Sequence, residues 1–409
     1  MRRTMVLRSD VSQRFDIELH DGRVIETRYR KGVPRPYVKE HASPAAAEQA
    51  FRKRLQTKRA EGFVHVAVEG EVEPNGLRLE ARSAGGGGGG VLDLSTDGRW
   101  LAGADVEPQA YGCRVWVMNV ESGLERTVLS RAAGPRQTFV HAALFDATAS
   151  RLVVQLNDEV LLVDLEAGTE RLLSAWREHQ DSRFNPFVVR PVMNEARRRC
   201  AVPGANDEVS VVDLSTGEVV RQFSTRSATT ECRGLALSPR GDALALYVPS
   251  RGLVYGHEDA RHDPSNRVEV YDVDTGARRA SFEPPSKLDL LGFGPHAEEL
   301  WVTWASAQGP VCYDLVDGQE RWRFADERRR DRLDLAFSCA CSPVGLYAVG
   351  RDGLELYDAR GPGRPTGPLP RLRLGHARVS RVVFSNDGVW LAAWGNGVAW
   401  VQRAPRLEP

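Results

Sequence analysis

The sequence has few cysteines and no long hydrophobic run. Its 409 residues include six cysteines, at positions 113, 200, 232, 312, 339 and 341, without dense or regular spacing. This pattern does not indicate a disulfide framework, so we expect reduced thiols in a cytoplasmic protein. No apolar stretch approaches the roughly 20 residues that span a bilayer, and the N-terminus lacks the apolar core of a secretory signal. We therefore expect no membrane partner.

The short motifs of the common catalytic sites are also missing. The chain has no G-x-S-x-G, no G-x-x-x-x-G-K-[ST] and no H-E-x-x-H pattern, which mark a hydrolase nucleophile, a phosphate loop and a zinc protease. Cys339 and Cys341 form one Cys-x-Cys without a second pair, so no zinc site is predicted. We expect a protein that is not an enzyme and that holds no metal and no cofactor.

The chain as a whole has no net charge, but its charged residues are unevenly distributed. The chain has 55 basic and 55 acidic residues. Residues 1–66 hold 15 Lys and Arg against 8 Asp and Glu, a net charge of +7, which leaves −7 for the remainder. Such asymmetry indicates either a segment that binds a polyanion or a basic domain that is merely soluble.

What the sequence does contain is a repeat. A β-rich run is followed by Asn or Asp, an apolar residue and a turn with glycine, and the copies are 42 to 59 residues apart. Two apolar runs joined by a glycine turn precede several copies, as in residues 92–104 and 382–394. The period is that of a four-stranded propeller blade, about 40–45 residues. The repeated positions are Asn119, Asp164, Asp213, Asp272, Asp314, Asp358 and, in a seventh copy, Gln402.

The fold that these repeats predict is mainly β, a seven-bladed β-propeller over residues 91–405. The longest spacing, between Asp213 and Asp272, is explained by an inserted surface loop at about residues 249–266. Over residues 91–403 the repeats resemble the WD40-like propeller superfamily, with Tyr-Asp or Val-Asp where that family often has Trp-Asp. The resemblance implies that an early strand completes the last blade. Residues 77–82 are the candidate, within a segment 67–90 that also holds six consecutive glycines.

Residues 1–66 predict a small α+β domain. An Asp-Gly pair at 21–22 lies between two strand-like runs and predicts a hairpin. Ser43 and Pro44 predict the start of a helix that runs to about Ala60. Residues 12–32 and 38–66 resemble a WGR domain, whose Trp-Gly-Arg falls on Tyr29, Arg30 and Lys31 here. In DNA-damage-responsive ADP-ribosyltransferases this domain contacts DNA ends and neighbouring domains, which implies a nucleic-acid contact.

Two sets of residues are candidates for binding. The first would contact DNA or RNA phosphates through basic groups and stack bases on an aromatic ring; the alternative is an edge strand kept soluble by charge. The second would form a cationic rim on the propeller for a protein partner; the alternative is ordinary surface charge. The first set is Arg28, Tyr29, Arg30, Lys31, Arg35 and Lys39, and the second is Arg190, Arg233, Lys287, Arg332 and Arg381.

The function that the sequence favours is an interaction scaffold, in which the propeller binds a protein partner and the N-terminal domain adds a second contact. The alternative is an adaptor that docks on DNA or RNA through the basic N-terminal domain. An enzyme is the third reading, and it depends only on the versatility of propellers.

Overall fold

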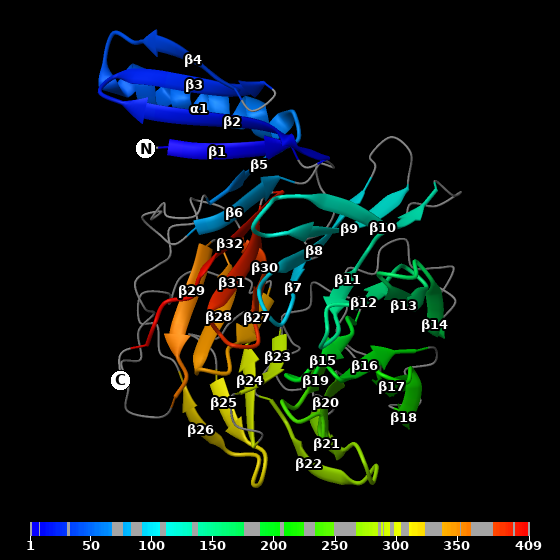
Figure 1. The fold of residues 1–409 in the computed structure, drawn as a ribbon. Helices are drawn as coiled ribbons and strands as arrows, with labels where there is room; N and C mark the ends of the chain where they lie inside the picture. The colour runs from blue at the N-terminus through cyan, green and yellow to red at the C-terminus, as the bar shows by residue number, and fades with distance from the viewer. Residues whose placement is uncertain are drawn as a thin grey trace, which may run out of the picture.

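The computed structural model describes one α-helix, α1 (Pro44–Ala60), and a series of short β-strands that are grouped into sheets (Figure 1). The sheets surround a common centre, and the helix lies at the N-terminal side of the molecule. The described residues are 2–7, 9–30, 33–67, 77–82, 92–106, 112–132, 138–175, 189–204, 208–224, 234–248, 267–284, 288, 290–294, 298–303, 311–323, 338–351, 353–360, 379–395 and 397–407.

Six of the sheets are separate. Five have four strands and one has three, and in each sheet the strands follow one another in chain order. This antiparallel arrangement is that of propeller blades. The strands are β7 (Leu92–Leu94), β8 (Trp100–Val106), β9 (Cys113–Asn119) and β10 (Glu125–Arg131); β11 (Ala142–Phe145), β12 (Arg151–Gln155), β13 (Glu159–Asp164) and β14 (Glu170–Ala175); β15 (Val192–Met193), β16 (Arg199–Pro203), β17 (Glu208–Asp213) and β18 (Glu218–Ser224); β19 (Gly234–Leu237), β20 (Ala243–Val248), β21 (Arg267–Asp272) and β22 (Arg278–Phe282); β23 (Leu290–Phe293), β24 (Glu299–Thr303), β25 (Val311–Asp314) and β26 (Glu320–Arg323); and β27 (Ser338–Cys341), β28 (Leu346–Arg351) and β29 (Gly353–Asp358).

A seventh sheet has nine strands, and it corrects two expectations. Its order is β30–β31–β32–β6–β5–β1–β2–β3–β4. The described part of the chain therefore has six separate blades, not seven, because the last propeller strands are not a sheet of their own: β6 pairs with β32 on one side and with β5 on the other. For the same reason a separate N-terminal α+β domain is not shown. These strands are β30 (Val379–Phe384), β31 (Trp390–Gly395), β32 (Val398–Arg403), β6 (Leu77–Arg82), β5 (Phe63–Val66), β1 (Arg2–Leu7), β2 (Asp10–His20), β3 (Arg23–Arg30) and β4 (Val33–Glu40).

The repeated Asn or Asp forms the turn between the third and fourth strands of a blade. In β13, Oδ1 of Asp164 accepts hydrogen bonds from the backbone N–H groups of Glu166 and Ala167, at 3.0 and 2.8 Å. Asn119 in β9 accepts in the same way from Glu121 and Ser122, at 3.1 and 2.8 Å. A short polar side chain that binds the backbone ahead of it fixes a tight turn. The repeat in the sequence is thus a repeat of turns.

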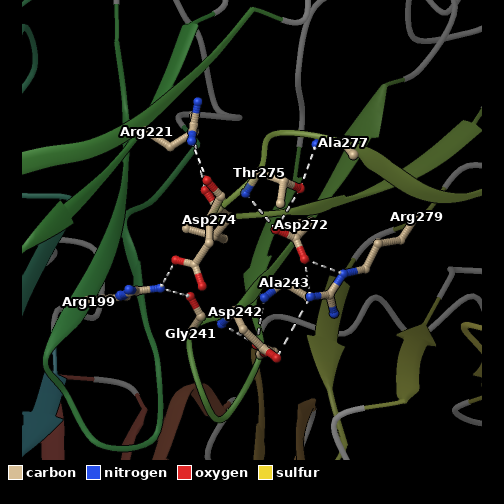
Figure 2. Close-up of polar contacts among 12 residues, drawn as sticks. Arg199, Arg221, Gly241, Asp242, Ala243, Asp272, Asp274, Thr275, Ala277 and Arg279 are labelled. Carbon is tan, nitrogen blue, oxygen red and sulfur yellow. Dashed lines mark hydrogen bonds and ion pairs between the residues drawn. The ribbon is translucent and has the colours of Figure 1, made fainter.

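Neighbouring blades are also joined by polar contacts, as Figure 2 shows for the third and fourth separate sheets. Nη1 of Arg199 in β16 donates to the carbonyl oxygen of Gly241 and approaches Oδ1 of Asp274, each at 3.0 Å. Arg221 in β18 donates to the carbonyl oxygen of Asp274. Both acceptors lie in turns of the adjacent sheet, so arginines of one blade satisfy the exposed carbonyls of the next.

The N-terminal elements confirm two local predictions. His20 and Arg23 pair across the Asp21-Gly22 turn, where both residues have positive φ, 45° and 76°. The Ser43 hydroxyl accepts from the backbone N–H of Ala46 at 3.2 Å and so caps α1. The helix packs on the sheet through an apolar cluster whose largest members are Met5, Ile17, Phe51, Leu55 and Phe63.

The N-terminal strands are bound tightly to the propeller. Val6, Val64 and Val66 belong to the same buried cluster as Leu79 of β6 and residues of β8, β9, β31 and β32. Arg59 at the end of α1 forms an ion pair with Glu80 at 2.7 Å, and both side chains are mostly buried. The two parts of the chain therefore share a hydrophobic core as well as a sheet.

Candidate functional site

The inner strands of the sheets enclose a cavity of about 470 Å³. Residues of β7, β11, β15, β19, β23, β27 and β30 line it, and these are the first strands of the six separate blades and of the β30–β31–β32–β6 set. Figure 1 shows these strands near the middle of the ring. Cavities of this size accept small molecules or single side chains, so the centre of the propeller is the best candidate site.

A buried ion pair crosses this cavity. Arg197 follows β15 and holds Asp93 of β7 with both guanidinium nitrogens; Nη2 lies 3.0 Å from Oδ1, and Nη1 donates to Oδ2. Nη1 also donates to the carbonyl oxygen of Phe145 at 3.0 Å, and Oδ2 of Asp93 accepts from the N–H of Phe145 at 2.8 Å. A bidentate pair with these additional hydrogen bonds satisfies both charges. Arg197 and Asp93 thus tie three blades together.

The turn that carries Arg197 forms part of the cavity wall. Asn386, in the turn after β30, accepts from Nε of Arg197 at 3.3 Å and donates to the carbonyl oxygen of Glu195 at 2.5 Å. The N–H of Ala147 donates to the carbonyl oxygen of Arg197 at 3.2 Å. Arg197 has φ of +52°, an uncommon value for a residue with a side chain. The network across the ring holds this turn in place.

Two further arginines, Arg190 and Arg381, contribute positive charge to the cavity wall. Burial lowers the pKa of the Arg190 guanidinium to about 10, and the positive charge of Arg381 adds to this effect. Burial also lowers the pKa of Arg381, and the positive charge of Arg197 acts in the same direction, whereas Asp93 opposes the shift. The cavity wall therefore carries positive charge on groups that are partly buried.

Two residues of the predicted cationic rim, Arg190 and Arg381, belong to the described part of the chain. Arg190 and Arg381 both line the cavity, on different sheets. The other three predicted residues, Arg233, Lys287 and Arg332, lie outside the described residues, as does the predicted insertion at 249–266. The rim as a partner-binding surface therefore stays a prediction for all five positions.

The predicted nucleic-acid residues do not share one surface. Arg28 pairs directly with Arg35, and Val24 pairs with Lys39, so Arg28, Arg35 and Lys39 lie on one face of the β3–β4 ladder. Tyr29 lies on the opposite face, where its hydroxyl donates to Oδ2 of Asp16 at 2.6 Å.

The individual residues of this set also differ in their surroundings. Arg28 contacts Glu26, with 3.0 Å between Nε and Oε1. Arg35 and Lys39 are exposed. Arg30 ends β3 and Lys31 lies outside the described residues. The Tyr29 hydroxyl is thus engaged within the N-terminal sheet, and its hydrogen bond to Asp16 raises the pKa of Tyr29.

Sequence reasoning missed Asp93, Arg197 and Asn386. The available signal is a charged residue inside an apolar strand: Asp93 stands between Leu92 and Leu94. Such a residue in an inner strand needs a partner. Nothing in the sequence indicates that the partner follows about 100 residues later, because only the packing of three consecutive blades brings β7 and the turn after β15 together.

In the part of the chain that the structure describes, no three His, Cys, Asp or Glu side chains are close enough to hold a metal ion. Burial raises the pKa of the Cys339 and Cys341 thiols, which disfavours thiolate ligands. Among the described helical residues, none forms a segment with the length and apolar character that crossing a membrane requires.

Comparison with known proteins supports the fold and no more than the fold. No protein-family model matches the chain, so neither the WGR nor the WD40-like resemblance is supported at that level. No curated protein matches it in sequence. A chain from the crystal structure of the mitotic checkpoint complex is similar in structure, with a TM-score of 0.58 and 15% identity, over 83% of this chain and 95% of that chain. Together with the ring of blades, this likeness shows that the chain is a mainly β protein with a β-propeller fold.

Proposed function

We propose that the chain is a non-enzymatic, cytoplasmic scaffold whose propeller binds a protein partner. The observation that supports it best is the central cavity, which is lined by the first strand of every blade and carries arginines. A rigid ring with an accessible, charged centre is suited to recognition. The similar chain comes from a complex of several proteins, which agrees with a binding role.

The propeller in this proposal has seven blades. The set β30–β31–β32–β6 has four antiparallel strands, as a blade does, and its first strand lines the cavity beside the others. Because β6 precedes β7 in the chain, pairing between β6 and β32 would close the ring with strands from both ends of the propeller. Residues 91–405 with this closing strand would then be the propeller, and residues 67–90 the connecting segment.

The test compares two surface variants of the full chain. Glu195 is an exposed residue at the cavity, and Glu218 is an exposed residue at the start of the outer strand β18. We expect Glu195→Trp, whose larger side chain obstructs the cavity, to lose a protein that the unmodified chain retains when purified from its native cells, and Glu218→Trp to keep it. If both variants retain the protein equally well, the partner binds away from the cavity or the propeller binds no partner.

A second candidate function is nucleic-acid binding by the N-terminal elements, which would make the WGR-like region a second contact. The shared face of Arg28, Arg35 and Lys39 favours it. We expect the binding of fluorescent double- and single-stranded DNA, or RNA, to fall steeply with salt. The double variant Arg35→Glu/Lys39→Glu should weaken it.

The nucleic-acid experiment requires the full chain. Residues 1–66 alone would expose Val6, Val64 and Val66, which are buried against the propeller. An isolated fragment could therefore misfold and lose binding for that reason alone. Salt-independent binding, or binding that the double variant leaves unchanged, would reject this function.

A further inference from the structure

Arg190 and Arg381 bring positive charge into a partly buried cavity. Arg190 lies just before β15 and Arg381 lies in β30, so two different sheets supply them. Both side chains line the cavity and are only partly exposed. Taking a cation out of water costs free energy unless an anion is placed beside it. The arrangement therefore calls for negative charge in the cavity.

The described part of the chain supplies too little of that negative charge. The cavity lining includes three arginines, Arg190, Arg197 and Arg381, and two carboxylates, Asp93 and Glu195. Asp93 is held by both nitrogens of Arg197, and Glu195 is exposed in its turn. Arg190 has no hydrogen bond or ion pair with any other described residue, whereas the Arg197 guanidinium is fully used. Among the described residues, the positive charge of Arg190 thus has no counterpart.

We propose that Arg190 and Arg381 form an oxyanion site in the central cavity, which binds the carboxylate or phosphate group of a ligand. A guanidinium group presents two parallel N–H donors that match the oxygens of such a group. The volume of about 470 Å³ far exceeds a single ion. Val189, Leu235 and Leu291 also line it, so the site takes an anion with an apolar body.

The proposed ligand has two sources with the same chemistry. One is a free organic anion, and the other is an acidic side chain that a protein partner inserts into the ring. Only the second rests on the scaffold function, because a free anion would bind whether or not the propeller holds a protein. Retention of a partner in the purification experiment, without anion binding here, would overturn the oxyanion site and leave the scaffold standing.

Calorimetric titration of the full chain tests the site with three probes. These are inorganic phosphate, benzoate, and a glutamate tetrapeptide with blocked ends. We expect saturable binding of at least one probe, weakened about tenfold or more in Arg190→Gln and in Arg381→Gln, because charge-assisted hydrogen bonds are lost. Arg35→Gln removes the same charge from an exposed strand and should bind normally.

The pattern of binding separates the two sources. Binding of the peptide alone would assign the site to a partner's acidic side chain, and binding of benzoate or phosphate would assign it to a free anion. If no probe binds, or if the cavity variants bind as well as Arg35→Gln, the proposal is wrong.

A second measurement covers the case in which a variant is poorly folded. If Arg190 carries an unbalanced charge, Arg190→Met should unfold at the same temperature as the unmodified chain or at a higher one when no anion is added. The anion probes should then raise the unfolding temperature of the unmodified chain but not of Arg190→Met. A lower unfolding temperature for Arg190→Met without any probe would show that Arg190 has a structural partner, and would overturn the site.

Discussion

The ion pair between Arg197 and Asp93 connects three parts of the propeller. Their side chains are almost fully buried, and they join the first blade, the second blade and the turn after β15. A buried pair is weak evidence of net stabilisation, because both charges have been taken out of water. Removal of one partner is much more costly, since the other charge then remains alone in the interior.

We predict that Asp93→Leu lowers the free energy of unfolding by about 3–5 kcal/mol, because it leaves Arg197 buried without its carboxylate. The double variant Asp93→Leu/Arg197→Met should lose less than the sum of the two single variants. Chemical denaturation of the four proteins measures this coupling. Additive losses would mean that the two side chains act independently and that their contact does not stabilise the ring.

Asp16 makes the N-terminal sheet sensitive to acid. Burial would raise the pKa of Asp16, but hydrogen bonds from Tyr29, Arg14, Arg2 and Thr4 outweigh it and hold the pKa below the usual value near 4. A carboxyl group with a lowered pKa in the folded state stabilises the protein above its unfolded pKa. This contribution is lost as the pH falls through the lower, folded pKa.

We therefore predict that Asp16→Asn unfolds more easily than the unmodified chain at neutral pH. The difference should shrink as the pH falls below about 4, where the carboxyl of the unfolded chain takes up a proton, and vanish below the lower pKa of the folded state. Thermal unfolding followed between pH 7 and pH 3 provides the measurement, with the exposed Asp21→Asn as the control. A difference that is constant with pH would remove the electrostatic explanation.

At the scale of elements, β4 is the exposed edge of the nine-stranded sheet. All of its side chains are exposed, including those of Val33, Tyr37 and Val38. Such an edge can pair with another chain. Pro34 and Pro36 have no backbone N–H group to donate. In edge strands, proline occurs where that N–H would point to solvent, so it is the free side of the strand that lacks a donor. The two prolines thus hinder pairing of this edge with another chain, whereas its exposed apolar side chains would favour such pairing.

We predict that Pro36→Val increases self-association, because it restores a donor to this edge and adds a residue that favours strands. Analytical ultracentrifugation over a range of concentrations would detect the change. Adding Val38→Lys should reverse it, since charge on an edge strand opposes pairing. If Pro36→Val sediments as the unmodified chain does, Pro36 does not prevent self-association through this edge.

At the scale of the whole molecule, the N-terminal strands and the propeller form one structure. Val6, Val64 and Val66 are packed against β6 and the blades on either side of it. Gly123, in the turn after β9, is so close that a Cβ atom there would lie 2.7 Å from a methyl carbon of Val64. Packing of this density usually makes two parts unfold together.

We predict a single cooperative unfolding transition for the full chain. Val64→Asp should separate an early transition of the N-terminal elements from that of the propeller, with a loss of about 3 kcal/mol or more from burial of an unpaired charge. Differential scanning calorimetry distinguishes the two cases. The control is Val38→Asp on the exposed strand β4, which should leave the transition unchanged. Two transitions in the unmodified chain would contradict the shared core.

The sequence by itself determined the local features of this protein. The Asx turns follow from Asp and Asn at fixed spacing, the Asp21-Gly22 hairpin from residues that tolerate positive φ, and the start of α1 from Ser43 and Pro44. Each depends on contacts within a few residues, which a linear pattern records. The β-propeller fold was predictable as well, because the period of the repeat equals the length of a blade.

Only the tertiary structure decided how these pieces meet. It joined β5 to β6 and so merged the N-terminal strands with the last propeller strands, which is why six separate blades are found where seven were predicted. It placed the hydroxyl of Tyr29 beside Asp16, and it brought Asp93 of the first blade to Arg197 of the third. These contacts join residues that are separated along the chain, and they depend on how strands and blades pack together, which no local pattern records.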